Sequence, residues 1–390
     1  MSSSVPAPDK RPHGHVTQLD RRRRDSDRCR LWVIRVDLTE RPSLPVFRRS
    51  RTYSGSSSEV LDHSRWVRSM PRSVSRMMTF AAAVRSDVLS SALTKEFSQT
   101  TAHTEMGVQM ITIPELVAQA LGSFLTSDTR DRFGTSQARL AEVLPFAAKL
   151  TLECIGNSDA LYHNVEHSML VTLAGHDILM GRMMLRPTTT VDYANFILAC
   201  LTHDIGYVRG IVQGDSEESY VADLSGRTVR LPRGSSDAAL APYHVDRSKL
   251  FVSERLDGVE EVDAGRIARA IEYTRFPYTG SSNDELIEEE GMLLRAADLI
   301  GQLGDPNYLR KSNALFYEFE EIGLNKKLGY ETPADVVYKY PQFYWSNVAP
   351  QIQTAIRYLN ITSSGRQWIA NLYSNVFRAE REPNLSGPQL

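Results

Sequence analysis

The sequence predicts an all-α protein that carries one small β-hairpin. From Ile111 to Ala379, apolar residues recur at three- and four-residue spacing over most of the chain, which is typical of amphipathic helices. Residues 209–238 depart from this pattern, because two short β-type runs there flank a Ser-Gly turn. We find no series of strands and no internal repeat. We therefore expect one helical domain over residues 107–390.

The composition supports a globular core. Of the 390 residues, 42% are hydrophobic, and the formal net charge is −2. Such a chain can bury a sizeable core and is not disordered as a whole. Three cysteines without a CxxC pair argue against a disulfide framework or a thiolate zinc site, and they favour a reducing compartment. No apolar run approaches the ~18 residues of a membrane helix, so we expect a soluble, cytoplasmic protein without a membrane partner.

Residues 1–106 differ from the rest. They are rich in Arg, Ser and Pro, include the run Arg21–Arg24, and lack a sustained apolar period. Such a segment cannot bury enough surface to offset its chain entropy, so we expect a disordered basic arm. The arm could bind nucleic acid, or it could be a solvated tail or sequence upstream of the true start, and the solvated tail is the commoner case. The sequence does not indicate an oligomeric state.

The helices of the first half are delimited by breaking and capping residues. Gly156 interrupts the pattern, Ser158 or Asp159 could cap the next helix, and Pro187 ends that helix before Thr189 or Thr190 opens another. The expected helices share an apolar face, and the last is apolar over nearly its full length, as a central core helix should be. They cover Ile111–Leu125, Ser136–Cys154, Leu161–Leu185 and Val191–Asp204.

The second half begins with the hairpin, which we expect to turn at Gly226. Helical periodicity resumes after it. The expected helices cover His244–Leu256, Gly265–Tyr273, Glu285–Leu303, Tyr308–Ile322, Val348–Leu359 and Gly365–Ala379.

Histidines and carboxylates at three places in this helical region point to a metal site. His163 and His167 are four residues apart, so on a helix they would share one face. His203 and Asp204 end the apolar helix, where burying them unpaired would be costly. Asp298 interrupts another apolar helix and needs a cation, which could be a metal ion or Arg295. His176 lies nine residues beyond His167, on roughly the opposite face, so we expect it to be structural.

His167, His203, Asp204 and Asp298 together offer two imidazoles and two carboxylates. This mixed nitrogen and oxygen set suits one or two divalent metal ions, whether Zn²⁺, Fe²⁺, Mn²⁺ or Mg²⁺. Asp204 could bridge two ions, because a carboxylate has two oxygens.

The ordered set His163, His167, His203-Asp204 and Asp298 resembles the signature of the HD superfamily of metal-dependent phosphohydrolases. The motif Tyr162-His-Asn-x-x-His167 resembles the first metal helix of class I cyclic-nucleotide phosphodiesterases. The resemblance covers about residues 161–310 and implies an HD-domain helical bundle. Tyr207 stands where those phosphodiesterases carry a further histidine, so the resemblance is stronger for the superfamily than for a cyclic-nucleotide substrate.

The resemblance implies a phosphoric ester hydrolase that uses a metal-activated water on a small-molecule phosphoester or nucleotide, including a cyclic nucleotide phosphodiester. His167, His203, Asp204 and Asp298 would be metal ligands, and His163 would be the catalytic general acid. A second metal or the phosphate would lie near His244, Asp204 and Tyr207.

The hairpin insertion could cover this site. Arg227, Arg230 and Arg233 fall on or after it and could form a phosphate-binding lid, although exposed surface charges are at least as common. Two alternatives to the phosphodiester reading stay open. One is a nucleotide or nucleoside phosphate hydrolase of the same superfamily, and the other is a non-catalytic HD regulatory module.

Overall fold

The computed structural model describes residues 112–134, 137, 139–277, 280 and 283–381. These residues are mostly helical and contain one two-stranded sheet, so the prediction of an all-α fold with a small hairpin is confirmed. The basic segment 1–106, for which we predicted disorder, lies outside the described residues. In the described part of the chain, no helix combines the length and the apolar character needed to cross a membrane.

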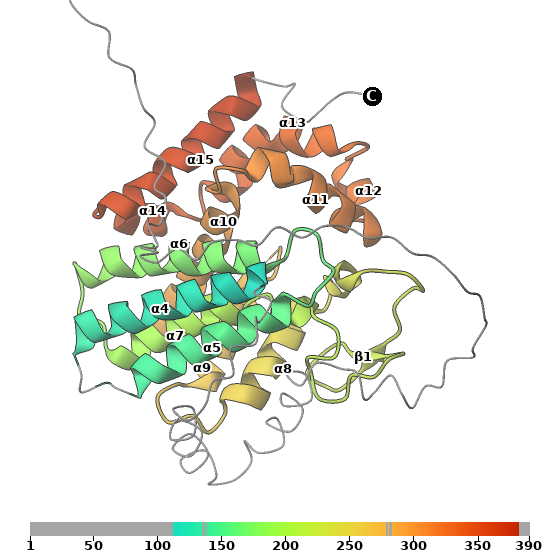
Figure 1. Ribbon diagram of the computed structural model, residues 1–390. Coiled ribbons are helices and arrows are strands. Elements are labelled where there is room, and N and C mark those ends of the chain that lie inside the picture. Colours follow the sequence, from blue (N-terminus) through green and yellow to red (C-terminus); the bar gives the residue numbers. More distant parts are fainter. Residues whose placement is uncertain (1–111, 135–136, 138, 278–279, 281–282, 382–390) are drawn as a thin grey trace, which may run out of the picture. The chain divides into compact units, whose positions relative to one another are not determined.

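The first half of the fold consists of four helices that run side by side in Figure 1. They are α4 (Ile113–Phe133), α5 (Leu140–Ile155), α6 (Val165–Met183) and α7 (Thr190–Thr202). Helix α7 is the central one, because every residue from Tyr193 to Thr202 is buried. The predicted start of α7 is confirmed, since Thr189 and Asp192 form a capping box there.

The hairpin pairs β1 (Tyr220–Val221) with β2 (Thr228–Val229) in antiparallel register. Gly226 has a φ of +80°, a conformation that glycine adopts without strain, so the predicted turn is also confirmed. Several short helical segments flank the hairpin or follow the later helices. They are η2 (Ile205–Tyr207), η3 (Asp237–Leu240) and η4 (Glu272–Thr274), together with the π-helical turn η5 (Tyr344–Val348).

The second half continues with further helices, several of which pack against α6 or α7. They are α8 (His244–Leu256), α9 (Ala264–Ile271), α10 (Glu285–Leu303), α11 (Tyr308–Glu321), α12 (Leu324–Leu328), α13 (Pro333–Phe343), α14 (Gln353–Leu359) and α15 (Ser363–Arg381). Helices α8 and α10 have the predicted bounds. We did not predict α12, α13 or η5.

The start of α6 differs from the prediction in a way that affects the site. We expected this helix to begin near Leu161 with a cap at Ser158 or Asp159, but it begins at Val165. The side chain of Asn164 caps it by accepting hydrogen bonds from the backbone N–H groups of residues 166 and 167. His163 therefore lies in the turn before α6 and does not share a helical face with His167.

Candidate metal centre

The carboxyl end of α7 carries two of the predicted ligands into the interior. His203 is fully buried and Asp204, which directly follows it, is 7% exposed. Nδ1 of His203 lies 2.9 Å from the carbonyl oxygen of Cys200. Because a carbonyl only accepts, Nδ1 must carry a proton, so in the neutral imidazole Nε2 is the nitrogen with the free lone pair. This nitrogen lies 3.1 Å from Oδ2 of Asp204.

Helices α6 and α10 bring two further predicted ligands to the same place. Nε2 of His167, in the first turn of α6, lies 3.2 Å from Oδ2 of Asp204 and 3.4 Å from Oδ1 of Asp298 on α10. The same Asp298 oxygen lies 3.6 Å from Nε2 of His203. The structure therefore gathers all four side chains, although they come from three helices that are far apart in the sequence.

The imidazole nitrogens of this cluster have the character of metal ligands. Among the described residues, Nε2 of His167 and Nε2 of His203 are buried without a hydrogen-bond partner, although carboxylate oxygens lie within 3.1–3.6 Å of them. Buried polar atoms are rarely left without partners unless a ligand or ion satisfies them. The donor atoms of His167, His203 and Asp298 all lie within 4.8 Å of one another, and two imidazoles with carboxylates suit a divalent transition metal.

The charges of the cluster favour a cation. Burial alone would raise the pKa of Asp204, but the neighbouring His203 and His167 lower it well below its ordinary value. Burial alone would lower the pKa of His203, but the carboxylates of Asp204 and Asp298 raise it well above the ordinary value. The two acidic groups thus draw positive charge into the interior, and a divalent ion can provide that charge in place of protons.

His163 approaches the centre from the turn before α6. Its Nδ1 lies 2.5 Å from Oε2 of Glu318, a buried carboxylate on α11. Burial lowers the pKa of His163, but the charge and the hydrogen bond of Glu318 raise it to about 9. Oε1 of Glu318 also accepts from the backbone N–H of Tyr162 at 2.6 Å and of His163 at 3.2 Å. Glu318 therefore fixes both the ring and the backbone of His163.

Glu318 is a candidate site residue that we did not predict from the sequence. The sequence signal was weak, because Glu318 stands between Tyr317 and Phe319 but is followed by two further glutamates. His163 also lies within 4.8 Å of the donor atoms of His167 and Asp204, which is close enough for it to be a ligand itself.

Tyr207 and His244 occupy the other side of Asp204. The ring of Tyr207 stacks on His163 with centroids 4.4 Å apart and on His244 with centroids 4.6 Å apart. Nδ1 of His244 donates to the carbonyl of Ala241 at 2.6 Å, so Nε2 is free to face Oδ1 of Asp204 at 3.6 Å. Burial lowers the pKa of His244. The two oxygens of Asp204 therefore face different imidazoles.

The hairpin arginines lie outside this cluster. Arg227 pairs with Asp223 at 2.8 Å, and its guanidinium lies 5.8 Å from the ring centroid of Tyr243, the residue before His244. Arg230 pairs with Glu218 at 3.5 Å, and Arg233 is exposed. The phosphate-binding lid stays a prediction.

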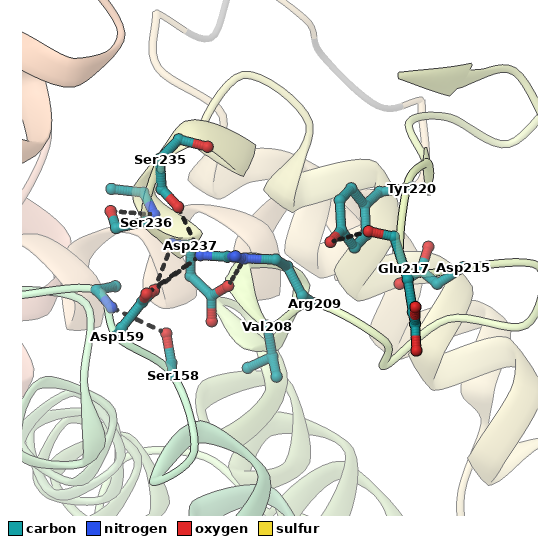
Figure 2. Close-up of polar contacts among 12 residues, drawn as sticks. Ser158, Asp159, Val208, Arg209, Asp215, Glu217, Tyr220, Ser235, Ser236 and Asp237 are labelled. Atoms are coloured by element: carbon teal, nitrogen blue, oxygen red, sulfur yellow. Dashed lines mark hydrogen bonds and ion pairs between the residues drawn. The ribbon is translucent and has the colours of Figure 1, made fainter. Parts of the chain in front are cut away.

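A polar network ties the hairpin insertion to the loop that precedes His163 (Figure 2). Arg209 donates to Asp237, to both carboxylate oxygens of Asp159 and to the carbonyl of Ser235. Asp159 also accepts from the backbone N–H of Asp237 at 2.6 Å. Arg209 thus joins the two ends of the insertion and connects them to the segment before α6.

His176, which we expected to be structural, lies in a separate cluster. Its Nε2 is 3.1 Å from Oδ2 of Asp128, and its ring packs edge-on against Phe124 with centroids 4.8 Å apart.

A family model described as Npun_R2479-like matches residues 111–382. Because the match covers well over half of the chain and nearly all of its described residues, the chain belongs to the Npun_R2479-like family. No curated protein and no solved structure matches the chain. The resemblance to the HD superfamily therefore stays a prediction that rests on the residues themselves.

Proposed function

We propose that this member of the Npun_R2479-like family is a metal-dependent phosphohydrolase that acts on a small-molecule phosphoester. The observation that carries the proposal is the convergence of His167, His203, Asp204 and Asp298, with carboxylate oxygens 3.1–3.6 Å from the buried Nε2 atoms of both histidines. These four side chains would hold one divalent ion. When bound, such an ion supplies Lewis-acid polarisation of phosphoryl oxygens and a water of lowered pKa.

His163 would act as the general acid. Glu318 holds Nδ1 of His163, so Nε2 is the nitrogen that can face a substrate. The pKa of His163 is raised to about 9, so the ring is protonated at neutral pH. It can therefore donate the proton that an alkoxide leaving group needs. The buried carboxylate of Glu318 stabilises that imidazolium and fixes its orientation.

His244 and the outer oxygen of Asp204 offer a place for a second ion or for a phosphate oxygen. His244 has a lowered pKa and a lone pair on Nε2, and Oδ1 of Asp204 lies 3.6 Å away. Tyr207 separates this imidazole from His163 by stacking between them, so the two rings stay apart and keep distinct roles.

Two alternatives remain open. A nucleotide or nucleoside phosphate hydrolase would use the same cluster on a monoester or triphosphate. A non-catalytic regulatory module would keep the fold without turnover, but all the ligand and acid side chains are present, which favours an enzyme. The few cysteines of the chain agree with a cytoplasmic location.

A substrate panel tests the proposal. The purified protein, loaded with Mn²⁺ or Mg²⁺, is incubated with cyclic nucleotides, nucleoside monophosphates and nucleoside triphosphates, and released phosphate or opened diester is measured. We expect hydrolysis of at least one class, and its loss on adding a chelator. Hydrolysis that persists in Asp204→Asn would show contamination, and the absence of turnover on every class would favour the regulatory module.

A further inference from the structure

A cavity of about 160 Å³ adjoins the candidate metal centre. His167 lines it, as do Leu170, which is one turn further along α6, and Gly301, which is one turn beyond Asp298 on α10. The two helices that carry His167 and Asp298 therefore both reach the cavity within one turn of these candidate ligands. A group in this cavity would lie against His167, the one candidate ligand among the residues that line it.

We propose that this cavity is the subsite for the organic part of the substrate, and that it takes one uncharged ring with a hydrogen-bond acceptor next to a donor. A nucleoside offers two such rings, the pentose and a pyrimidine base. This inference rests on the proposed phosphohydrolase function and specifies its substrate class.

The size of the cavity limits the occupant to one ring. An engineered apolar cavity of about 150 Å³ in another protein accommodates benzene. A cavity of about 160 Å³ therefore matches a single five- or six-membered ring and is too small to hold a whole nucleotide. Leu161, Leu170 and Ala314 provide apolar contacts for the faces of such a ring.

The polar groups of the cavity define the edge of that ring. The ammonium group of Lys311 lies 2.6 Å from Oε1 of Glu166 and 2.5 Å from Oδ2 of Asp305. An ammonium group has three N–H donors, so one remains for an acceptor on the ligand. The side chain of Glu166 is half exposed and can accept from a ligand donor beside that acceptor.

The charge of the cavity disfavours a second phosphate. Two carboxylates, Glu166 and Asp305, surround a single ammonium group, so a further anion would meet net negative charge. The polyphosphate chain of a nucleoside triphosphate would therefore be repelled here, whereas the uncharged ring of a nucleoside monoester or cyclic diester would not.

Calorimetric titration of the Mn²⁺-loaded protein tests this subsite with three probes: uridine 5′-monophosphate, ribose 5-phosphate and inorganic phosphate. We expect at least one ring-containing probe to bind about tenfold or more tightly than inorganic phosphate. Preference for both ring probes indicates that the pentose occupies the cavity, and preference for the uridine nucleotide alone indicates that the base does.

Cavity-filling variants make the test specific. Ala314→Leu fills the cavity from α11, and Leu170→Phe fills it from α6. If one variant folds poorly, the other still provides the test. Both variants should reduce the preference for the ring-containing probe over inorganic phosphate to about twofold. The affinity for inorganic phosphate itself should stay unchanged. Asn313→Leu, an exposed neighbour on α11 that does not line the cavity, should behave like wild type.

A wild-type protein that binds all three probes equally, or a preference that survives both filling variants, would overturn the subsite. Failure of the proposed function is a different result, because then neither inorganic phosphate binding nor ester hydrolysis would be detected. In that case free uridine and free ribose decide the matter: binding of either one to wild type but not to Ala314→Leu supports the cavity, and equal binding or none refutes it.

Discussion

At the scale of single residues, the pairing of His163 with Glu318 distinguishes the proposed general acid from the candidate metal ligands. The imidazole is anchored by a buried carboxylate on α11, and the four candidate ligands belong to other elements. A change at His163 should therefore affect turnover without emptying the metal centre.

We expect His163→Ala to keep its bound metal and to lose about 10²–10⁴-fold in kcat, which is the usual contribution of a general acid. The measurement is hydrolysis of the best substrate from the panel, with metal content determined on the same sample. His176→Ala is the matched control, since it removes a buried imidazole outside the cluster. Loss of metal from His163→Ala would make this histidine a ligand instead of the acid.

The sequence allowed much of the centre to be predicted at this scale. His203-Asp204 and Asp298 are conspicuous because the former end an apolar helix and the latter interrupts one. Glu318 is also a carboxylate beside apolar residues, but its partner His163 is 155 residues away. The sequence alone therefore offers no reason to connect Glu318 with His163. The role of Tyr207 was equally hidden, because ring stacking depends on how three separate segments meet.

At the scale of elements, the close approach of α6 and α10 positions His167 against Asp298. A Cβ added at Gly301 would lie 2.7 Å from Cα of Val171, a distance that packed atoms do not adopt. The absence of a side chain at Gly301 therefore allows the two helices to bring their ligands together.

Gly301→Ala should push α10 away from α6, destabilise the protein by about 1–3 kcal/mol and weaken metal binding. Thermal unfolding and a metal titration measure the two effects. Gly122→Ala in α4 is the control, because its Cβ would meet Pro145 only at ordinary contact distances of 3.5–3.7 Å. That change should stabilise the protein by roughly 0.5–1 kcal/mol through helix propensity. Equal behaviour of the two variants would argue against the close-packing explanation.

Helix existence was easier to predict than helix ends. The period of apolar residues identified α7, α8 and α10 because their buried faces are continuous. The start of α6 was wrong by four residues, since Ser158, Asp159 and Asn164 can all cap a helix and only the packed structure selects Asn164. Helix α13 was missed because Pro341 lies inside it, and η5 was missed because it buries only Tyr344 and Val348, too few residues to show a helical period.

At the scale of the whole molecule, a buried ion pair fastens the hairpin insertion to the helical core. Arg247 of α8 is fully buried and makes two hydrogen bonds to Asp215, at 2.9 and 2.8 Å. The same guanidinium donates to the backbone carbonyls of Gly206, Val208 and Val221. One side chain therefore links α8, the segment that carries Tyr207, and strand β1.

Arg247→Met should destabilise the protein by about 3–5 kcal/mol, because it leaves a buried carboxylate and three carbonyl groups without their partner. Chemical denaturation measures the loss. Arg139→Met is the control, because the Arg139 side chain forms ion pairs with Glu260 and Glu261 but is 63% exposed. We expect no measurable change in the free energy of unfolding for this variant. If Arg247→Met loses no more stability than the control, the ion pair of Arg247 with Asp215 does not hold the insertion against the helical core.

The proposed function depends most on one divalent ion shared by His167, His203, Asp204 and Asp298, and elemental analysis of the purified protein tests for this ion most directly. After saturation with Mn²⁺ and removal of free metal, we expect at least one ion per chain in wild type. Asp204→Asn and Asp298→Asn should each lose it while the protein remains folded by circular dichroism. A metal-free wild type, or variants that retain the wild-type content, would contradict the account.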